Sequence, residues 1–506
     1  MKTTSRSQKA LLNTIAGFMD EFVSLICGLI LPRLILLSFG SDYNGITSSV
    51  TQFISIISLM KAGIGGVTRV ALYKPLAEND YQGISAVVVQ TEKFMRKVAL
   101  IFVGFSLFFA ATYPFIINNE FDWLFSFTLI LIISISTFAQ YYFGLTYQMV
   151  LNADQKQSIT LFFNMATTIA NTIISVLIIK AGGGIHMVKL GSSAVFVISP
   201  LLLSRYVIRK YHIDKSVNSK EDLIKQRWDA VGHEVANFVN NNTDIMVLTI
   251  FTSLTEVSVY TVYHYVIVGI RKIIVNFITG FGAAFGNMYV KKEYNLMQKN
   301  LRLYELIVFS LTAVIYSVTL VMIVPFAKLY TIGVTDADYI RPLFAAIYTM
   351  SGVFSCLRIP YETIVKAVGH YKQTRNGAFM EAAINITVSI IFVIKYGLIG
   401  VAIGSLCAAV FRTFQYALYL GRVIMPRSFE IFIKHLFIVL CINACLVFLS
   451  KTYMIEINNV KQWLLIASVT GIIACAITLI TDLLFYRNDT KELYNKMKHV
   501  FAGIKK

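Results

Sequence analysis

Long apolar runs recur along almost the whole chain and constrain its fold more than any other feature. A helix needs about 20 mostly apolar residues to cross the hydrocarbon core of a bilayer. Only 14% of the residues are charged, whereas about a quarter is typical of a soluble protein. The sequence therefore predicts an all-α polytopic membrane protein. We count fourteen candidate spans, at 11–38, 45–68, 94–117, 122–150, 158–180, 185–208, 231–254, 260–288, 303–327, 339–365, 374–396, 398–424, 430–451 and 460–486.

The placement of the basic residues predicts the orientation of these spans. The chain carries a formal net charge of +18, and its bases gather at the two termini and in alternate loops. The loops after the first, third and seventh spans contain no Lys or Arg. Because short cytoplasmic loops carry the excess of positive charge, we expect both termini to be cytoplasmic. The charge then reflects topology, and we expect no nucleic-acid partner. The six cysteines form no CxxC pair, which argues against a metal site or disulfide framework.

An internal repeat at an offset of about 214 residues divides the spans into two halves. Six spans at that offset preserve orientation, which predicts two lobes related by an axis along the membrane normal. We expect an N-lobe at 1–213, a linker and C-lobe at 214–425, and two further spans with a cytoplasmic tail at 426–506. The matching residues are Lys156, Gln157, Asn171, Ser175, Lys180, Gly182, Gly191 and Ser192 in the first half, and Lys372, Gln373, Asn385, Ser389, Lys395, Gly397, Gly404 and Ser405 in the second.

The run 260–288 carries three basic or titratable side chains inside a predicted span: His264, Arg271 and Lys272. A charge at the centre of a membrane helix costs roughly 2.5–3.5 kcal/mol, so these side chains should face a protein-lined cavity. His264 and Arg271 are seven residues apart and share a helix face, with Tyr263 nearby, whereas Lys272 points about 100° away from Arg271. Arg271 is therefore the first candidate for a ligand contact.

Acidic and amide side chains mark two other predicted spans. Asp20 and Glu21 lie in the first span, and Asp20 shares a face with Ser24. Asp244 follows Asn241 and Asn242 in the seventh span. Such a polar run either forms a hydrogen-bond network between helices or contacts an ion or a sugar. We expect Asp20, Glu21 and Asp244 to be candidates for ion coupling, with Glu381 of the eleventh span as a fourth.

Further charges and prolines interrupt the apolar spans. Lys61 in the second span either anchors the helix at the interface or lines the cavity. In the tenth span, Arg358 and Glu362 are spaced for an intrahelical ion pair, and Pro360 between them makes a bending point. Together with Pro32 of the first span, these three residues are our gating candidates. Arg412 lies in the middle of the twelfth span. Intramembrane guanidinium groups suit an anionic ligand, above all a phosphate.

The span count, the two halves and three phrases together resemble a known family. The phrases are NTDIMVL at 242–248, IFTSLTEVSVYTVY at 250–263 and IVKAVGHYKQTRNGAFMEAAINI at 364–386. The whole chain resembles the polysaccharide-type (Wzx-like) flippases of the multidrug/oligosaccharidyl-lipid/polysaccharide exporter superfamily. The resemblance implies two lobes around a cationic central cavity and alternating-access transport of an undecaprenyl-diphosphate-linked oligosaccharide, for O-antigen or capsule biosynthesis. Relatives that flip lipid II carry bases in their first two spans, whereas this chain has Asp20 and Glu21 in the first.

The resemblance and the residues together give the expected site and its alternatives. We expect Arg271, Arg412, Lys272 and Lys61 near the diphosphate, and Asn241, Asn242, Tyr263 and His264 near the sugars. No cofactor is expected beyond H⁺ or Na⁺ coupling. The partners would be the lipid-linked glycan, membrane lipids, and a glycan polymerase or glycosyltransferases. An ion-coupled multidrug antiporter of the same fold is the alternative. A membrane polymerase or ligase fits less well because the outward loops are short and HExxH is absent, so we predict no enzyme.

Overall fold

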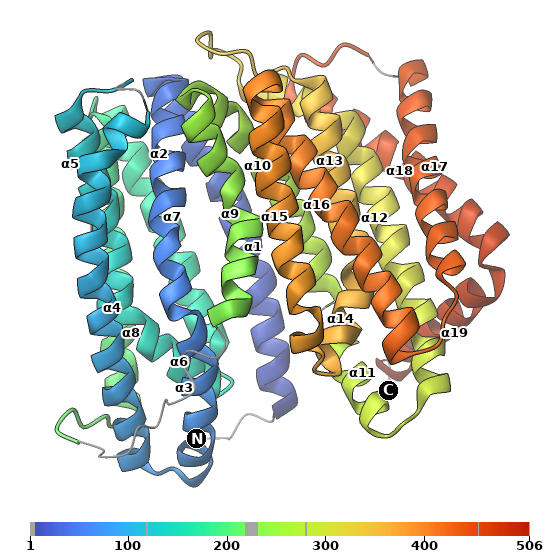
Figure 1. The fold of residues 1–506 in the computed structure, drawn as a ribbon, viewed down its shortest axis with the longest axis horizontal. Coiled ribbons are helices and arrows are strands. Elements are labelled where there is room, and N and C mark those ends of the chain that lie inside the picture. The colour runs from blue at the N-terminus through green and yellow to red at the C-terminus, as the bar shows by residue number, and fades with distance from the viewer. Residues whose placement is uncertain (1–5, 118–119, 218–230, 279–280, 454, 505–506) are drawn as a thin grey trace. The chain divides into compact units, whose positions relative to one another are not determined.

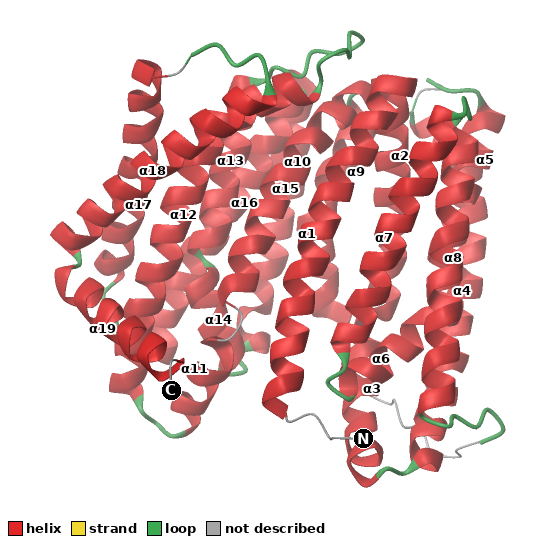
Figure 2. Ribbon diagram, turned by 180° about the vertical axis from the view of Figure 1, so that it is seen from behind, coloured by secondary structure: helices red, strands yellow, loops and turns green. Residues whose placement is uncertain are grey.

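The structure, a computed structural model, describes residues 6–117, 120–217, 231–278, 281–453 and 455–504. Every regular element in those residues is a helix (Figures 1 and 2). By their internal contacts the residues divide into two units, Met1–Thr261 and Val262–Lys506. The division falls inside one helix, whereas the sequence places it at 213/214. Part of the predicted linker, residues 218–230, lies outside the described residues.

The first unit is a bundle of helices from α1 to the start of α10 (Figure 1). Two of the helices begin at aspartates that accept backbone N–H bonds, Asp80 from Gly83 at 2.9 Å and Asp122 from Leu124 at 3.1 Å. The helices are α1 (Arg6–Phe39), α2 (Ser41–Ile54), α3 (Ser58–Glu78), α4 (Tyr81–Ile116), α5 (Trp123–Ala139), α6 (Leu145–Ala153), α7 (Gln157–Lys180), α8 (Ile185–Lys210), α9 (Val231–Phe251) and α10 (Leu254–Ile278).

The second unit contains the rest of α10 and nine more helices (Figure 1). Its last two long helices contact α12 through polar side chains, since Ser317 donates to Asn443 at 2.5 Å and Ser310 donates to Asp482 at 2.7 Å. The helices after α10 are α11 (Phe281–Val290), α12 (Tyr294–Tyr330), α13 (Pro342–Leu357), α14 (Ile359–Ala367), α15 (Tyr371–Tyr396), α16 (Leu398–Tyr419), α17 (Phe429–Tyr453), α18 (Val460–Phe485) and α19 (Arg487–Ile504).

Twelve of the described helical segments are long and apolar enough to cross a membrane, so the chain is a multi-pass membrane protein. The predicted spans 45–68 and 231–254 are not among the twelve, and the count of fourteen is not confirmed. Helix α2 ends at Ile54, and the described apolar part of α9, Asn242–Phe251, is too short to be counted. The two helices bond to one another. Ser49 and Thr249 are joined at 2.8 Å, and Gln52 donates to Asn242.

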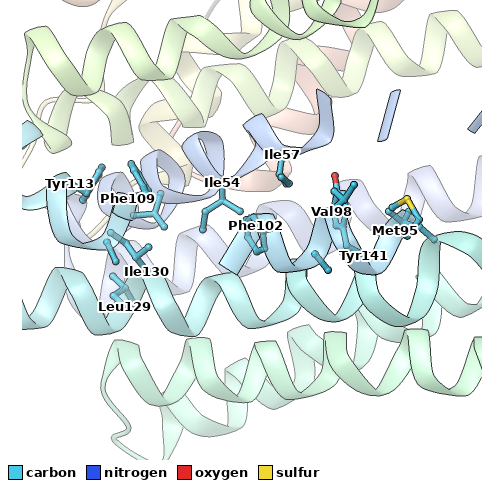
Figure 3. Close-up of a cluster of buried hydrophobic side chains, with 14 of the residues drawn as sticks. Ile54, Ile57, Met95, Val98, Phe102, Phe109, Tyr113, Leu129, Ile130 and Tyr141 are labelled. Carbon is cyan, nitrogen blue, oxygen red and sulfur yellow. The ribbon is translucent and has the colours of Figure 1, made fainter. Parts of the chain in front are cut away.

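The core of the first unit is a cluster of aromatic and aliphatic side chains from α2, α4 and α5 (Figure 3). Phe102, Phe109 and Tyr113 of α4 pack there with Ile54 of α2 and Ile130 of α5. The buried Tyr113 hydroxyl donates to Ser49 at 2.8 Å, which satisfies a polar group that burial would otherwise penalise. This cluster fixes α2, and through Ser49 it fixes α9 as well.

The repeated sequence positions occupy matching places in two helical hairpins, α7–α8 and α15–α16. Asn171 and Ser175 of the first hairpin are buried, as are Asn385 and Ser389 of the second. Gly191 and Gly404 each let the second helix approach the first. A Cβ on Gly191 would lie 2.5 Å from Ile178, and a Cβ on Gly404 would lie 2.1 Å from the Ser389 hydroxyl. The two hairpins thus use equivalent residues for close packing. The axis relating the lobes stays a prediction.

Two predicted spans have different bounds in the structure, and the predicted tail contains a further helix. The expected span 260–288 is α10, which begins six residues earlier at Leu254, followed by α11. Arg271 therefore lies in the last third of the apolar segment Leu254–Asn276 rather than near its middle. The expected span 339–365 is interrupted at Arg358. The expected tail contains α19, whose polar sequence hid it from a search for apolar runs.

Candidate functional site

A buried ion-pair cluster in the second unit joins three helical segments. Glu381 of α15 accepts from Arg358, between α13 and α14, at 2.5 Å, and its other oxygen lies 3.4 Å from Nε of Arg412 on α16. All three side chains are buried. The sequence indicates Glu381 as a candidate for ion coupling. The structure instead gives it two arginines from neighbouring helices.

The Arg412 guanidinium is held on every side by protein groups. It donates to the Thr374 carbonyl oxygen at 3.1 Å, to the Tyr416 hydroxyl at 2.7 Å and to Gln415, and it lies 4.1 Å from the Tyr416 ring centroid. Gly377 leaves room for this arrangement, because a Cβ there would lie 2.0 Å from the Gln415 amide. Arg412 therefore positions the cluster.

The predicted pair between Arg358 and Glu362 is confirmed, at 3.4 Å, and Glu362 also accepts from Lys366 at 2.6 Å. Arg271 lies within electrostatic range of Glu362. The ion-pair cluster thus contains three bases (Arg358, Lys366 and Arg412) and two acids (Glu362 and Glu381), with Lys366 half-exposed and Arg271 nearby without an ion pair to it. Among the described residues, no carboxylate lies within 4.0 Å of Arg271, so the excess positive charge is concentrated there.

The other predicted side chains of α10 face different partners. Nδ1 of His264 lies 2.7 Å from the Tyr348 hydroxyl, and Lys272 is its electrostatic neighbour. Tyr263 is fully buried, donates to the Tyr339 carbonyl oxygen at 2.6 Å and accepts from the Arg341 N–H at 3.2 Å. These bonds tie Tyr263 to the connection that precedes α13. Of these side chains and Arg271, only Arg271 has an electrostatic effect on Glu362 of the ion-pair cluster.

Three of the four gating candidates lie at the break between α13 and α14, and the fourth, Pro32, lies inside a continuous helix. Helix α13 ends at Leu357 and α14 begins at Ile359, with the buried Pro360 in its first turn. Proline restricts the preceding backbone and has no N–H, which favours an interruption here. Because Arg358 occupies the break, a change of bend would move one of the bases bound to Glu381. Pro32 lies inside α1, which continues to Phe39.

A polar cavity of about 420 Å³ lies within the first unit and is lined by Asp20. Ser24 lines it too, as the predicted shared face requires. The other polar lining residues come from α5 to α8, and the sequence reasoning missed them: Ser136, Thr137, Gln140, Gln148, Asn164, Thr167, Thr168 and Ser199. Their spacing was the available signal, since Asn164, Thr167 and Thr168 share one face of an otherwise apolar helix. The cavity combines one carboxylate with many neutral oxygens.

The polar run of α9 makes contacts inside the first unit. Tyr260 donates to the Asp244 carboxylate at 2.9 Å, and Asn242 accepts from Gln52 of α2. Glu21 is half-buried in α1. The side chains of Lys61 and Asn241 lie outside the described residues. Among the residues that the structure describes, no group of three His, Cys, Asp or Glu side chains could hold a metal ion.

Solved structures of membrane transporters share this fold. An inward-facing multidrug resistance MATE family transporter of the MOP superfamily matches with a TM-score of 0.56 and 15% identity, over 83% of this chain and 99% of that one. The Vibrio cholerae MATE transporter VcmN in its bent form matches with a TM-score of 0.54 and 14% identity, over 84% of this chain and 100% of that one.

A third structure, a MOP superfamily transporter from Pyrococcus furiosus, matches with a TM-score of 0.59 and 11% identity, over 83% of this chain and 99% of that one. It is described as having a binding pocket of reverse polarity that suggests a different function. No protein-family model and no curated protein matches the chain. At these identities the likeness concerns the fold. The chain therefore has the MATE-like fold seen in transporters of the MOP superfamily.

Proposed function

We propose that this protein is a flippase that moves an undecaprenyl-diphosphate-linked oligosaccharide across the bacterial cytoplasmic membrane. One observation carries the proposal: bases outnumber acids around the ion-pair cluster, where Arg358, Lys366 and Arg412 face Glu362 and Glu381 and Arg271 lies nearby. An uncompensated positive charge inside a membrane span is costly unless an anion balances it. A diphosphate supplies a comparable negative charge, and guanidinium groups bind its oxygens in pairs.

The predicted topology supports the proposal. With cytoplasmic termini, α10 and α13–α14 both end at the cytoplasmic side. Arg271 and Lys366 lie in the last thirds of their apolar segments, toward the cytoplasm, whereas Glu381 and Arg412 lie near the middle of theirs. A lipid-linked glycan assembled in the cytoplasm would meet Arg271 and Lys366 first. The glycan would then leave on the outer side by alternating access.

The geometry divides the predicted roles among the residues. Arg271 is the base that would contact the diphosphate, whereas Arg412 and Arg358 hold the ion-pair cluster in place through Glu381. Lys272 and His264 extend the polar surface of α10. Asn242 and the predicted sugar contact Asn241 belong to the α9 run. Asp20, in its polar cavity, is the foremost candidate for H⁺ or Na⁺ coupling, ahead of Glu21 and Asp244.

The second candidate function is an ion-coupled multidrug antiporter, favoured by the description of the MATE transporters with this fold. An excess of bases does not suit a cationic drug, because like charges repel inside a low-dielectric site. The Pyrococcus furiosus transporter supports a wider range of functions for the fold, since its pocket is described as having reverse polarity. We therefore place the glycan-lipid substrate first.

Arg271→Ala tests the proposed role of the ion-pair cluster. We expect glycan export to fall about ten- to hundredfold, because a charged hydrogen bond contributes about 1.5–3 kcal/mol. Arg271→Lys should keep part of the activity, since lysine preserves the charge without the bidentate geometry. The measurement is complementation of surface glycan in a deletion strain, with protein level determined in the same cells.

Lys395→Ala is the matched control. Lys395 is an exposed base at the C-terminal end of α15, 14 positions after Glu381 of the ion-pair cluster. Its export should equal that of the wild type. If Arg271→Ala and the double variant Arg271→Ala/Arg412→Ala are well expressed and both export glycan normally, the proposed site is wrong.

A further inference from the structure

The junction between α18 and α19 has no role in the proposed transport. Helix α18 ends at Phe485, and α19 begins two residues later at Arg487. Thr490 donates back to the Asp482 carbonyl oxygen at 3.2 Å and to the Tyr486 carbonyl oxygen at 3.0 Å. These bonds fix the start of α19 against the end of α18. Because α18 is a candidate span, α19 begins at the boundary between membrane and water.

One face of α19 is bound to the protein. Glu492 lies 3.1 Å from Lys299 of α12, and Lys496 donates to Asn300 of α12 at 3.2 Å. Lys496 also lies 3.3 Å from Glu492. The Glu492 carboxylate of α19 is therefore paired with α12, and polar contacts hold α19 on α12.

The opposite face of α19 is basic and exposed. Arg487, Lys491, Tyr494 and Lys498 are spaced by four, three and four residues, which places them on one side of the helix. All four side chains are exposed, Tyr494 by 67%. Three bases around a tyrosine are typical of a helix that meets the headgroup layer, where aromatic rings and long basic side chains are favoured.

A groove of about 580 Å³ begins beside this face, at the start of α17. Its wall includes Ile433 and Phe437, which is 66% exposed, and Lys434 lies between them in the chain. The Lys434 amine lies 5.6 Å from the Phe485 ring centroid and 5.3 Å from that of Tyr486, the two residues that lead into Arg487. The groove and the basic face of α19 are therefore contiguous within the second unit.

The charges of this surface select a negatively charged occupant. Its four bases are Lys434, Arg487, Lys491 and Lys498, and the acids on the same segments that are not paired to α12 are Glu430, which lines the groove, and Asp489. Two positive charges remain in excess. The apolar wall of the groove belongs to a candidate span, so acyl chains are the medium that would cover it.

We propose that this surface is a binding site for an anionic phospholipid of the surrounding leaflet. The acyl chain lies against Ile433 and Phe437, and the phosphate lies between the Lys434 amine and the basic face of α19. The lipid holds α17, α18 and α19 together at the membrane boundary. This site is separate from the ion-pair cluster, and its occupant stays in the membrane as a bound lipid and is not transported.

The test is lipid binding to the purified full-length protein in detergent, followed by native mass spectrometry. The probes are phosphatidylglycerol, phosphatidylcholine and glycerol phosphate, each in a titration. Each base near a charged bilayer surface changes affinity about fivefold. We expect phosphatidylglycerol to bind at least tenfold more tightly than phosphatidylcholine, and glycerol phosphate not to displace it.

The variant K434Q/R487Q/K491Q should lose at least tenfold in affinity for phosphatidylglycerol and none for phosphatidylcholine. K372Q/R375Q/K395Q is the matched control, since it removes three exposed bases of α15, which packs chiefly on α16, and its affinity should be unchanged. The charge-preserving variant K434R/R487K/K491R should bind as the wild type does, which separates loss of charge from loss of fold.

Three results would overturn the inference: equal affinity for the two lipids, equal loss in the two glutamine variants, or displacement of the lipid by glycerol phosphate. The last would assign the bases to a free phosphate. The assay involves no transport, so its failure and the failure of the proposed flippase function are distinguishable.

Discussion

Replacing Glu381 by alanine is expected to lower the melting temperature of the purified protein by about 3–5 °C. The Glu381 carboxylate is bound by Arg358 at 2.5 Å and lies 3.4 Å from Arg412, and all three side chains are buried. Removing one partner of a buried ion pair costs about 3–5 kcal/mol, because the remaining charge has lost both water and its counter-ion. Here one change would remove the carboxylate that two buried arginines share, of which Arg358 keeps Glu362 as a partner.

Glu362→Ala is the matched control for this experiment. Glu362 also pairs with Arg358, at 3.4 Å, but its side chain is 22% exposed, so water can replace part of the lost interaction. We expect a clearly smaller fall in melting temperature, with Glu381→Gln between the two. Equal melting temperatures for Glu381→Ala and Glu362→Ala would show that the buried ion-pair cluster does not stabilise the second unit.

Replacing Asp20 by asparagine is expected to reduce ion-driven glycan transport at least tenfold while leaving the fold intact. Asparagine has the same shape as aspartate and keeps its hydrogen-bonding oxygen, but it cannot carry a negative charge. The cavity around Asp20 is lined otherwise by neutral hydroxyl and amide groups, among them Ser24, Gln140, Asn164 and Thr168. Loss of the single lining carboxylate would remove the charge that a proton or a sodium ion needs. A tenfold loss of coupling corresponds to about 1.4 kcal/mol of coupling free energy.

The measurement is transport into vesicles of reconstituted protein, with H⁺ and Na⁺ gradients applied separately. Asp122→Asn removes the same charge outside the cavity, at the start of α5, where asparagine caps a helix as well as aspartate does, so its transport should be normal. Glu21→Gln tests the neighbouring candidate. Unchanged gradient dependence in Asp20→Asn would move the coupling site elsewhere.

The predictions that depend on one helix at a time agree with the structure. Apolar run length located twelve spans, and a spacing of four residues gave the pair between Arg358 and Glu362 and the shared face of Asp20 and Ser24. The repeated positions around Asn171 and Asn385 mark two hairpins with the same close packing. Helix periodicity is a local property, so the sequence contains it directly.

What the sequence could not provide depends on how different helices meet. Glu381 has partners 23 and 31 positions away along the chain, and no spacing rule within a helix links them. The Asp20 cavity gathers residues of five helices, α1 and α5 to α8, each with only a few polar side chains. Helix α19 was missed because it is amphipathic and short of apolar residues. The bonds between α2 and α9 likewise cannot be read from either helix alone.

The central claim, transport of a lipid-linked glycan, is tested most directly by deleting the protein and analysing the membrane lipids by mass spectrometry. The account predicts that undecaprenyl-diphosphate-linked oligosaccharide accumulates, that surface glycan is lost, and that the wild-type chain but not Arg271→Ala restores both. Unchanged lipid-linked intermediates, with normal surface glycan and increased drug susceptibility, would contradict the flippase function and establish the multidrug antiporter in its place.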